Sequence, residues 1–245
     1  MPASKPKSRP VGYTKAVQGL HALADPQRAE VSRGYFKDAG EDVFLGVPAP
    51  DIRKLSRQFY LLSLAGVRKL MRSRVHEERS LAHAILRVKF EKSPDAEQGI
   101  IFDFYIKNRN AICSWDGVDD SAPYIVGPYL LQRNKKLLYQ LVRSPRLWDR
   151  RIAIVSSWWF IRQGHTEDTL KLAALLLQDK EDLIHKATGW MLREVGKRDL
   201  AALKRFLQLH CRTMPRTMLR YAIERFTEKE RQRYLRGRHT VEHDE

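Results

Sequence analysis

Apolar residues recur at close to helical spacing along almost the whole chain from residue 13 onward. Between residues 77 and 90, for example, Leu81, Ala84, Ile85 and Val88 fall on one face of an amphipathic helix. No stretch of the chain shows the sustained apolar and polar alternation of a strand. The pattern predicts an all-α protein whose helices cover residues 13–24, 26–38, 51–60, 62–71, 77–90, 95–107, 116–131, 134–143, 147–163, 166–178, 181–196, 198–210, 214–226 and 227–236.

Several helix boundaries carry their own signals. Asp25-Pro26 and Ser93-Pro94 each predict a capping residue followed by proline at the first helical position. Gly40, Gly164 and the pair Ser144-Pro145 predict helix ends.

The helices recur in pairs about every 30–40 residues, which is typical of solenoids built from two-helix repeats. We therefore predict one continuous α-solenoid domain over residues 12–236, with a concave groove along one side. Residues 1–11 form a basic, proline-rich arm and residues 237–245 a tail, and both are expected to be disordered. The alternative is a compact, irregular all-α domain.

The charge of the chain indicates a polyanionic partner. Its 245 residues include 45 Lys and Arg against 29 Asp and Glu, a formal net charge of +16. Basic residues are concentrated in residues 52–92 and again in 131–164, where Asp149 is the one acidic residue. A solvated helix face explains most single lysines and arginines. For the clusters together we favour phosphate contact along a basic groove, with nucleic acid as the first candidate partner and an anionic membrane surface as the second.

Other protein classes lack their signatures in this sequence. No apolar run is long enough to cross a bilayer, and no apolar stretch follows the basic arm as in a secretory signal. Cys113 and Cys211 do not make a disulfide framework, and the histidines lack metal-ligand spacing. No phosphate-binding loop, dinucleotide fingerprint or helix-hairpin-helix turn occurs. We expect no metal, no cofactor and no membrane partner, and a cytoplasmic protein that associates with the nucleoid when bound to DNA.

All five tryptophans lie between residues 115 and 190, and three have a polar neighbour at helical spacing. These pairs are Trp115 with Asp119, Trp148 with Arg151, and Lys186 with Trp190. Each has an ordinary structural explanation: tryptophans pack in cores, Asp116 caps a helix or meets its dipole, and Asp119 pairs with an arginine of the next repeat. Their joint occurrence in a strongly basic solenoid favours a functional site.

Four blocks of the chain together resemble the AlkD family of DNA alkylation repair glycosylases. They occur in the order and spacing of that family, span about residues 12–226, and are individually weak. The resemblance implies a fold of HEAT-like helical repeats, in agreement with the solenoid. The blocks are Phe44-Leu45-Gly46-Val47-Pro48-Ala49-Pro50, Ser114-Trp115-Asp116-Gly117-Val118-Asp119, Trp148-Asp149-Arg150-Arg151-Ile152-Ala153-Ile154 and Ile184-His185-Lys186-Ala187-Thr188-Gly189-Trp190-Met191-Leu192-Arg193-Glu194.

The resemblance assigns roles one residue at a time. The family's catalytic aspartate falls on Asp119, and its other active-site residues fall on Trp115, Arg151 and Trp190. Tyr35 is a looser match to a tyrosine that faces DNA. Three neighbours are expected DNA contacts: Arg150, Trp148 and Lys186. Pro48 stands where the family's glycosylases can carry a polar residue, and it removes a possible DNA contact.

The activity implied by the resemblance is monofunctional excision of positively charged N3- and N7-alkylpurines from duplex DNA in base excision repair. The family leaves the damaged base largely in the duplex, so we expect a wide groove and excision without base flipping. We also expect the protein to be a monomer. A carboxylate near the sugar stabilises the oxocarbenium-like transition state. Two alternatives are a non-catalytic relative that binds damaged or branched DNA, and a HEAT-type protein scaffold, which the net charge disfavours.

Overall fold

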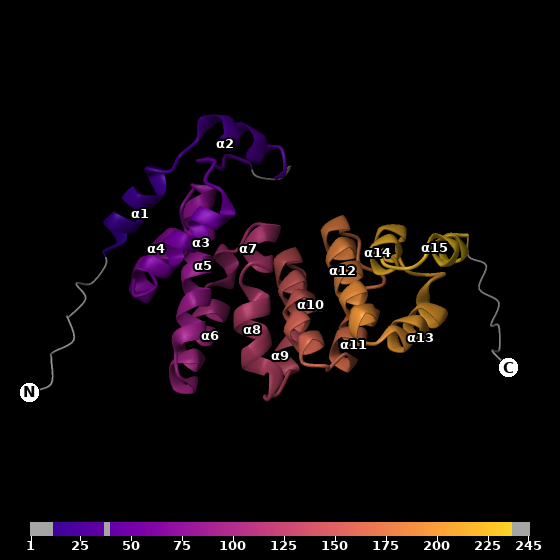
Figure 1. Cartoon of the computed structure of the whole chain (residues 1–245). Helices are drawn as coiled ribbons and strands as arrows, with labels where there is room; N and C mark the ends of the chain where they lie inside the picture. The colour runs from indigo at the N-terminus through magenta and orange to yellow at the C-terminus, as the bar shows by residue number, and fades with distance from the viewer. Residues whose placement is uncertain (1–11, 37–39, 237–245) are drawn as a thin grey trace, which may run out of the picture. The chain divides into compact units, whose positions relative to one another are not determined.

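The computed structural model describes residues 12–36 and 40–236 (Figure 1). Within these ranges the chain is all-α, without a strand; an isolated parallel bridge joins Val43 and Val75. The predicted arm 1–11, the tail 237–245 and the last two residues of the helix expected over 26–38 lie outside the described residues. The chain divides between Ser121 and Ala122 into two compact units. The expectation of a single domain over 12–236 stays a prediction.

The first unit is built around one long helix, α5, which contacts α1, α3, α4, α6 and α7. Of its predicted apolar face, Leu81, Ile85 and Val88 are buried and Ala84 is half-buried, while α5 also buries Ala82 and Leu86 outside that face. The elements of this unit are α1 (Tyr13–His21), α2 (Pro26–Arg33), α3 (Ala49–Gln58), α4 (Leu64–Met71), α5 (His76–Lys92), α6 (Asp95–Asn108), the short 3-10 helix η1 (Arg109–Ala111) and α7 (Trp115–Asp119).

The second unit shows the repeat order of a solenoid. Helices α8, α10, α12 and α14 form a row in which each packs on the next, while α9, α11 and α13 pack against members of that row. These elements are α8 (Ala122–Leu131), α9 (Lys136–Leu141), α10 (Leu147–Arg162), α11 (Glu167–Leu175), α12 (Asp182–Arg198), α13 (Leu200–His210), α14 (Arg216–Ala222) and α15 (Glu228–Leu235). The predicted all-α solenoid class is confirmed.

Two glycines allow close crossings within the row of the second unit. A Cβ atom added at Gly127 on α8 would lie 2.5 Å from the carbonyl oxygen of Ser156 on α10. A Cβ atom at Gly189 on α12 would lie 2.5 Å from the carbonyl oxygen of Met218 on α14. Any larger residue at either position would push the two helices apart.

The helix predicted over residues 116–131 is two helices, and this prediction was wrong. Helix α7 ends at Asp119 and α8 begins at Ala122. In one continuous helix the ring of Pro123 would clash with the carbonyl of Asp119, four residues earlier, and Pro123 has no N–H to donate. The break places Pro123 in the first turn of α8, where proline is tolerated.

The predicted caps hold in one case and shift by one residue in the other. The side chain of Asp25 accepts hydrogen bonds from the backbone N–H groups of Gln27 and Arg28 at 3.0 and 3.1 Å, with Pro26 at the first helical position of α2. The capping residue of α6 is Pro94, while Ser93 closes α5 and its hydroxyl group donates to Glu97.

Candidate functional site

Helix α7 carries the first two predicted site residues at its two ends. Trp115 begins the helix and Asp119 ends it, and both side chains are half-buried. Between them Gly117 and Val118 are buried against the unit. The indole ring of Trp115 stacks on the ring of Phe36, with centroids 5.3 Å apart and planes at 11°.

Three polar residues of α5 hold α7 in place. His76, Ser80 and His83 follow one another at helical spacing and therefore share a face of α5. The Nε2 atom of His76 lies 2.9 Å from Oδ2 of Asp116, and the Ser80 hydroxyl group lies 3.4 Å from the same oxygen. At the third position the imidazole ring packs directly against the backbone of α7, because a Cβ atom on Gly117 would lie 2.8 Å from Cε1 of His83.

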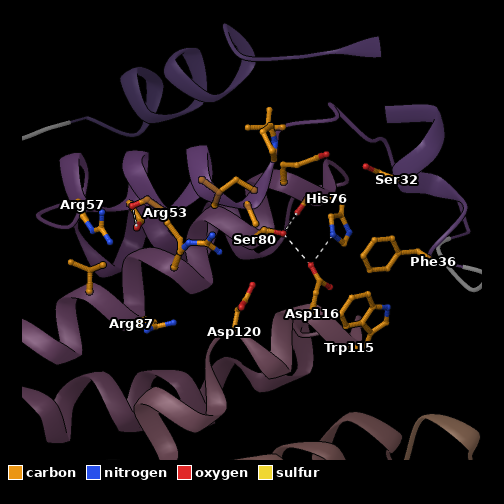
Figure 2. A pocket seen from close by; sticks show the side chains of 18 of the residues that line it. Ser32, Phe36, Arg53, Arg57, His76, Ser80, Arg87, Trp115, Asp116 and Asp120 are labelled. Carbon is orange, nitrogen blue, oxygen red and sulfur yellow. Dashed lines mark hydrogen bonds and ion pairs between the residues drawn. The ribbon is translucent and has the colours of Figure 1, made fainter. Parts of the chain in front are cut away.

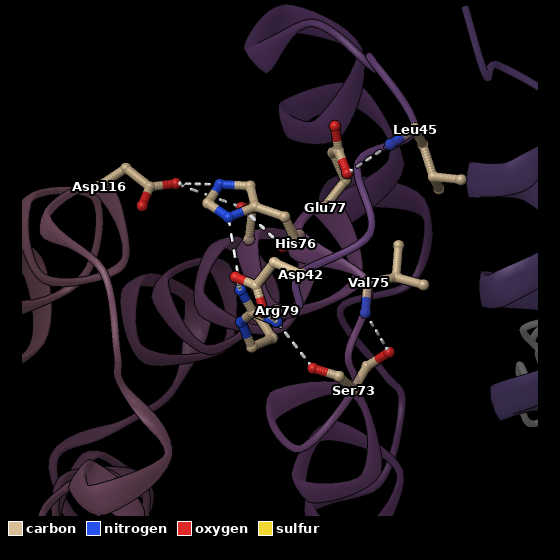
Figure 3. A network of polar contacts seen from close by, with 9 residues as sticks. Asp42, Leu45, Ser73, Val75, His76, Glu77, Arg79 and Asp116 are labelled. Carbon is tan, nitrogen blue, oxygen red and sulfur yellow. Dashed lines mark hydrogen bonds and ion pairs between the residues drawn. The ribbon is translucent and has the colours of Figure 1, made fainter. Parts of the chain in front are cut away.

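The His76–Asp116 contact belongs to a longer polar network (Figure 3). A guanidinium nitrogen of Arg79 lies 3.4 Å from Nδ1 of His76, and Arg79 also pairs with Asp42 and donates to the carbonyl of Ser73 at 2.8 Å. Because arginine only donates, Nδ1 accepts and the N–H at Nε2 points at Asp116.

Asp116 is held as a carboxylate by this network. Burial is the largest single effect and would raise its pKa, but the hydrogen bonds from His76 and Ser114 and the electrostatic effect of the two nearby imidazoles together outweigh it and lower the pKa to about 2. Asp116 is the first-turn acid of α7, in line with the dipole explanation of its sequence position, and it also anchors the helix to α5.

The backbone of the block that begins at Phe44 is held by the buried carboxylate of Glu77. The two oxygens of Glu77 accept hydrogen bonds from the backbone N–H groups of Leu45 and Gly46, at 2.9 and 2.8 Å. Gly46 adopts a φ of 76°, and a Cβ atom there would lie 2.2 Å from the carbonyl oxygen of Asp25. This turn therefore requires glycine, and it leads into Pro48, the residue before α3.

A cavity of about 420 Å³ opens between α3, α5 and α7 in the first unit (Figure 2). Trp115, Asp116, Asp120 and Pro48 line it, whereas Asp119 does not. No sequence pattern predicted this cavity. Tyr35, the looser match, lies in the turn after α2, and its side chain is 71% exposed.

Arg151 and Trp190 lie on neighbouring helices of the second unit. Arg151, on α10, is 5% exposed, and its Nη1 atom donates to the carbonyl of Leu183 on α12 at 2.6 Å. Trp190 is half-buried on α12, one turn after Lys186, whose ammonium group pairs with Asp182 at 2.7 Å.

The guanidinium group of Arg150 forms an ion pair and hydrogen bonds within the second unit. Its Nε atom lies 2.6 Å from Asp179, and its Nη1 atom donates to the carbonyls of Ser144 and Pro145 at 3.0 and 2.9 Å. These bonds join the start of α10 to the segment that precedes α12. Trp148, also on α10, is half-buried. The predicted DNA contacts of both residues stay predictions.

Sequence reasoning singled out Trp115 and Asp119 but missed both the ends of α7 and the residues that hold it. His76, Ser80 and His83 share helical spacing, but Glu77, Glu78, Arg79 and Arg87 are polar residues of the same helix, so no local signal singles out the three. The four-residue site implied by the resemblance takes Trp115 and Asp119 from the first unit and Arg151 and Trp190 from the second. As a single site it stays a prediction.

Neither a metal-binding cluster nor a membrane-spanning helix occurs in the described part of the chain. Residues 12–36 and 40–236 hold no group of three or more His, Cys, Asp and Glu side chains arranged to bind a metal ion. Across the same residues, no helix has the length and apolar character needed to span a membrane. His239 and His243 lie outside the described residues.

The comparisons with known proteins agree with the helical architecture. Residues 16–226 match the family of DNA alkylation repair enzymes, and the chain belongs to that family. A solved structure from Enterococcus faecalis, described as a predicted DNA alkylation repair enzyme, has the same fold with a TM-score of 0.68. It is 17% identical and covers 84% of this chain and 98% of its own. The comparison with curated proteins finds no match.

Proposed function

We propose that this family member is a monofunctional DNA glycosylase that hydrolyses the bond between deoxyribose and a positively charged N3- or N7-alkylpurine in duplex DNA. The partner is double-stranded DNA with alkylated bases, bound by a monomer in base excision repair. The excess of 16 positive charges supports a DNA partner. The site of action would be the cytoplasm, at the nucleoid.

The observation that carries the proposal is the arrangement of α7. Asp119 is half-buried at the end of a helix that the His76–Asp116 contact and the Gly117 crossing fix against α5. A fixed carboxylate stabilises positive charge that develops at the sugar carbon C1′ and orients a water molecule for attack. No general acid is required, because an alkylated cationic purine leaves as a neutral base.

The aromatic and cationic residues fit supporting roles. Trp115 and Trp190 are half-buried, so each presents part of an indole ring that attracts a cationic base. Arg151 is positioned by its bond to the Leu183 carbonyl, and a guanidinium group holds a phosphate through paired hydrogen bonds. Gripping the backbone in this way lets the base be excised without being flipped.

The deciding experiment measures base release from methylated duplex DNA under single-turnover conditions. We expect free N3-methyladenine and N7-methylguanine to be released, while the abasic strand stays uncut. Chromatography of the free bases and a denaturing gel of the strand report these two results. Tight binding of the same DNA without base release would contradict the proposal and favour the non-catalytic binder.

Substitution of the tryptophans distinguishes a role as a platform that contacts the damaged base from a role in the hydrophobic core. We expect Trp115→Ala and Trp190→Ala to slow excision by about one to two orders of magnitude, the loss expected from removal of a cation–π contact. Both should stay folded, since half-buried rings stabilise less than the roughly 3–5 kcal/mol of a buried aromatic. Phe160→Ala, which removes a fully buried ring, is the core standard in urea unfolding. Variants that unfold as readily as Phe160→Ala would contradict the platform role.

A further inference from the structure

The cavity in the first unit has the size and the mixed lining of a small-ligand site. Its volume of about 420 Å³ is within the range of known ligand pockets. Figure 2 shows Arg53, Arg57 and Arg87 reaching in from one side and the rings of Phe36 and Trp115 lying on the other. Asp119, the proposed catalytic residue, does not line the cavity. The cavity therefore needs an explanation of its own.

The arginine side of the cavity can bind an anion. Arg53 and Arg57 lie one turn apart on α3, so their like charges repel. Within residues 12–36 and 40–236, neither guanidinium group forms a hydrogen bond or an ion pair with another residue. A phosphate group would relieve this repulsion, because two guanidinium groups match its oxygens with paired hydrogen bonds.

The opposite side of the cavity offers aromatic side chains on which a planar ring can stack. Phe36 and Trp115 stack at 5.3 Å with planes at 11°, and the imidazole of His76 lies 4.3 Å from the Phe36 ring. All three side chains line the cavity. Nucleobases stack on such aromatic groups with little dependence on base identity, because every base has a π face.

Polar groups lie between the two sides. Figure 2 places the Ser80 hydroxyl group and the Asp120 carboxylate between the arginines and the aromatic rings. Burial raises the pKa of Asp120, as do the charges of Asp116 and Asp119, while Arg53 and Arg87 lower it. Ser80 and Asp120 can accept hydrogen bonds from a sugar hydroxyl group or from the edge of a base.

We propose that this cavity binds one nucleotide with an unpaired base, its phosphate on Arg53 and Arg57 and its base against Phe36 and Trp115. The order of phosphate, sugar and base in a nucleotide matches the order of cationic, polar and aromatic groups across the cavity. The nucleotide comes either from solution or from a strand with an unpaired position. The inference goes beyond the proposed glycosylase and does not depend on excision.

The first experiment titrates the full-length protein with dGMP and dAMP by calorimetry. We expect a dissociation constant below about 1 mM and at least about tenfold tighter binding than inorganic phosphate or deoxyguanosine, since phosphate and base each contribute. The double variant Arg53→Ala, Arg57→Ala should weaken dGMP binding about tenfold or more. Lys54→Ala removes one charge from the same helix outside the cavity lining and should have no effect on dGMP binding.

The second experiment tests the DNA source with 2-aminopurine fluorescence. One duplex carries 2-aminopurine as an unpaired, bulged nucleotide, and a matched duplex carries it fully paired. We expect the protein to quench the bulged probe by stacking, and we expect the arginine double variant and Phe36→Leu to lose that quenching. Binding of dGMP without quenching of the bulged probe identifies a free nucleotide as the ligand. Quenching without dGMP binding identifies an unpaired nucleotide of DNA. The proposal is overturned if dGMP binds no tighter than phosphate and the bulged probe is not quenched, or if neither response depends on these residues.

Discussion

We expect Asp119→Asn to excise alkylated purines about three orders of magnitude more slowly than the wild-type protein. The change removes a negative charge and keeps the shape of the side chain. At ~4 Å and an effective dielectric constant of ~20, a carboxylate and the charge at C1′ attract by about 4 kcal/mol, which corresponds to this change in rate. Single-turnover release of N7-methylguanine is the measurement. Affinity for duplex DNA should be preserved, because the phosphate contacts remain.

The two neighbouring acids provide matched controls. Asp120→Asn removes the same charge one residue later, from a side chain that faces the cavity, and should leave excision close to wild type. Asp116→Asn disturbs the contact with His76 and should lower stability as well as activity. If Asp119→Asn excises normally while one of its neighbours loses activity, the catalytic assignment is wrong, although the glycosylase proposal survives.

The second large effect concerns stability in acid and depends on His83. This side chain is 2% exposed, and neither ring nitrogen has a hydrogen-bond partner among the described residues. Burial lowers its pKa from 6.5 to about 4, with the charge of Arg79 acting in the same direction and that of Asp116 opposing it. Between these values the unfolded chain binds a proton that the folded chain does not. The free energy of unfolding is therefore not reduced by His83 above pH 6.5. It falls by about 3 kcal/mol as the pH approaches 4.

We expect His83→Leu to remove this part of the pH dependence. Leucine has a similar volume, cannot be protonated and leaves no ring nitrogen without a partner. Urea unfolding of both proteins at several pH values from 7 to 4.5 gives the comparison. The stability of the variant relative to wild type should rise steadily as the pH falls. His165→Gln, at an exposed position, should follow the wild type. Parallel curves for wild type and His83→Leu would contradict the prediction.

The helical class was predictable because spacing is a local property. Leu81, Ile85 and Val88 are buried on α5 at the positions that their periodicity selects. The break between α7 and α8 escaped that reasoning, because apolar spacing continues across it and the steric effect of Pro123 on a carbonyl four residues earlier decides the outcome.

Trp115 and Asp119 could be named as candidates from the sequence, but the residues that hold their helix in place could not. Trp115 and Asp119 were identified because a tryptophan and an acid at helical spacing stand out in one short block. The partners of that block are distant along the chain, since His76 lies 40 residues before Asp116. The cavity combines side chains of α3, α5 and α7 with Ser32 of α2 and Phe36 just after it, so its existence depends on packing that no local pattern encodes.

The brevity of α7 has a consequence for any ligand that reaches Trp115 or Asp119. A helix of 5 residues has almost no stability of its own in water, because nucleation is unfavourable and few hydrogen bonds follow it. The conformational entropy of its backbone, about 1–2 kcal/mol per residue, is lost when the chain folds onto α5. A ligand therefore meets side chains on an already ordered backbone, and its binding free energy is not reduced by the ordering of this helix.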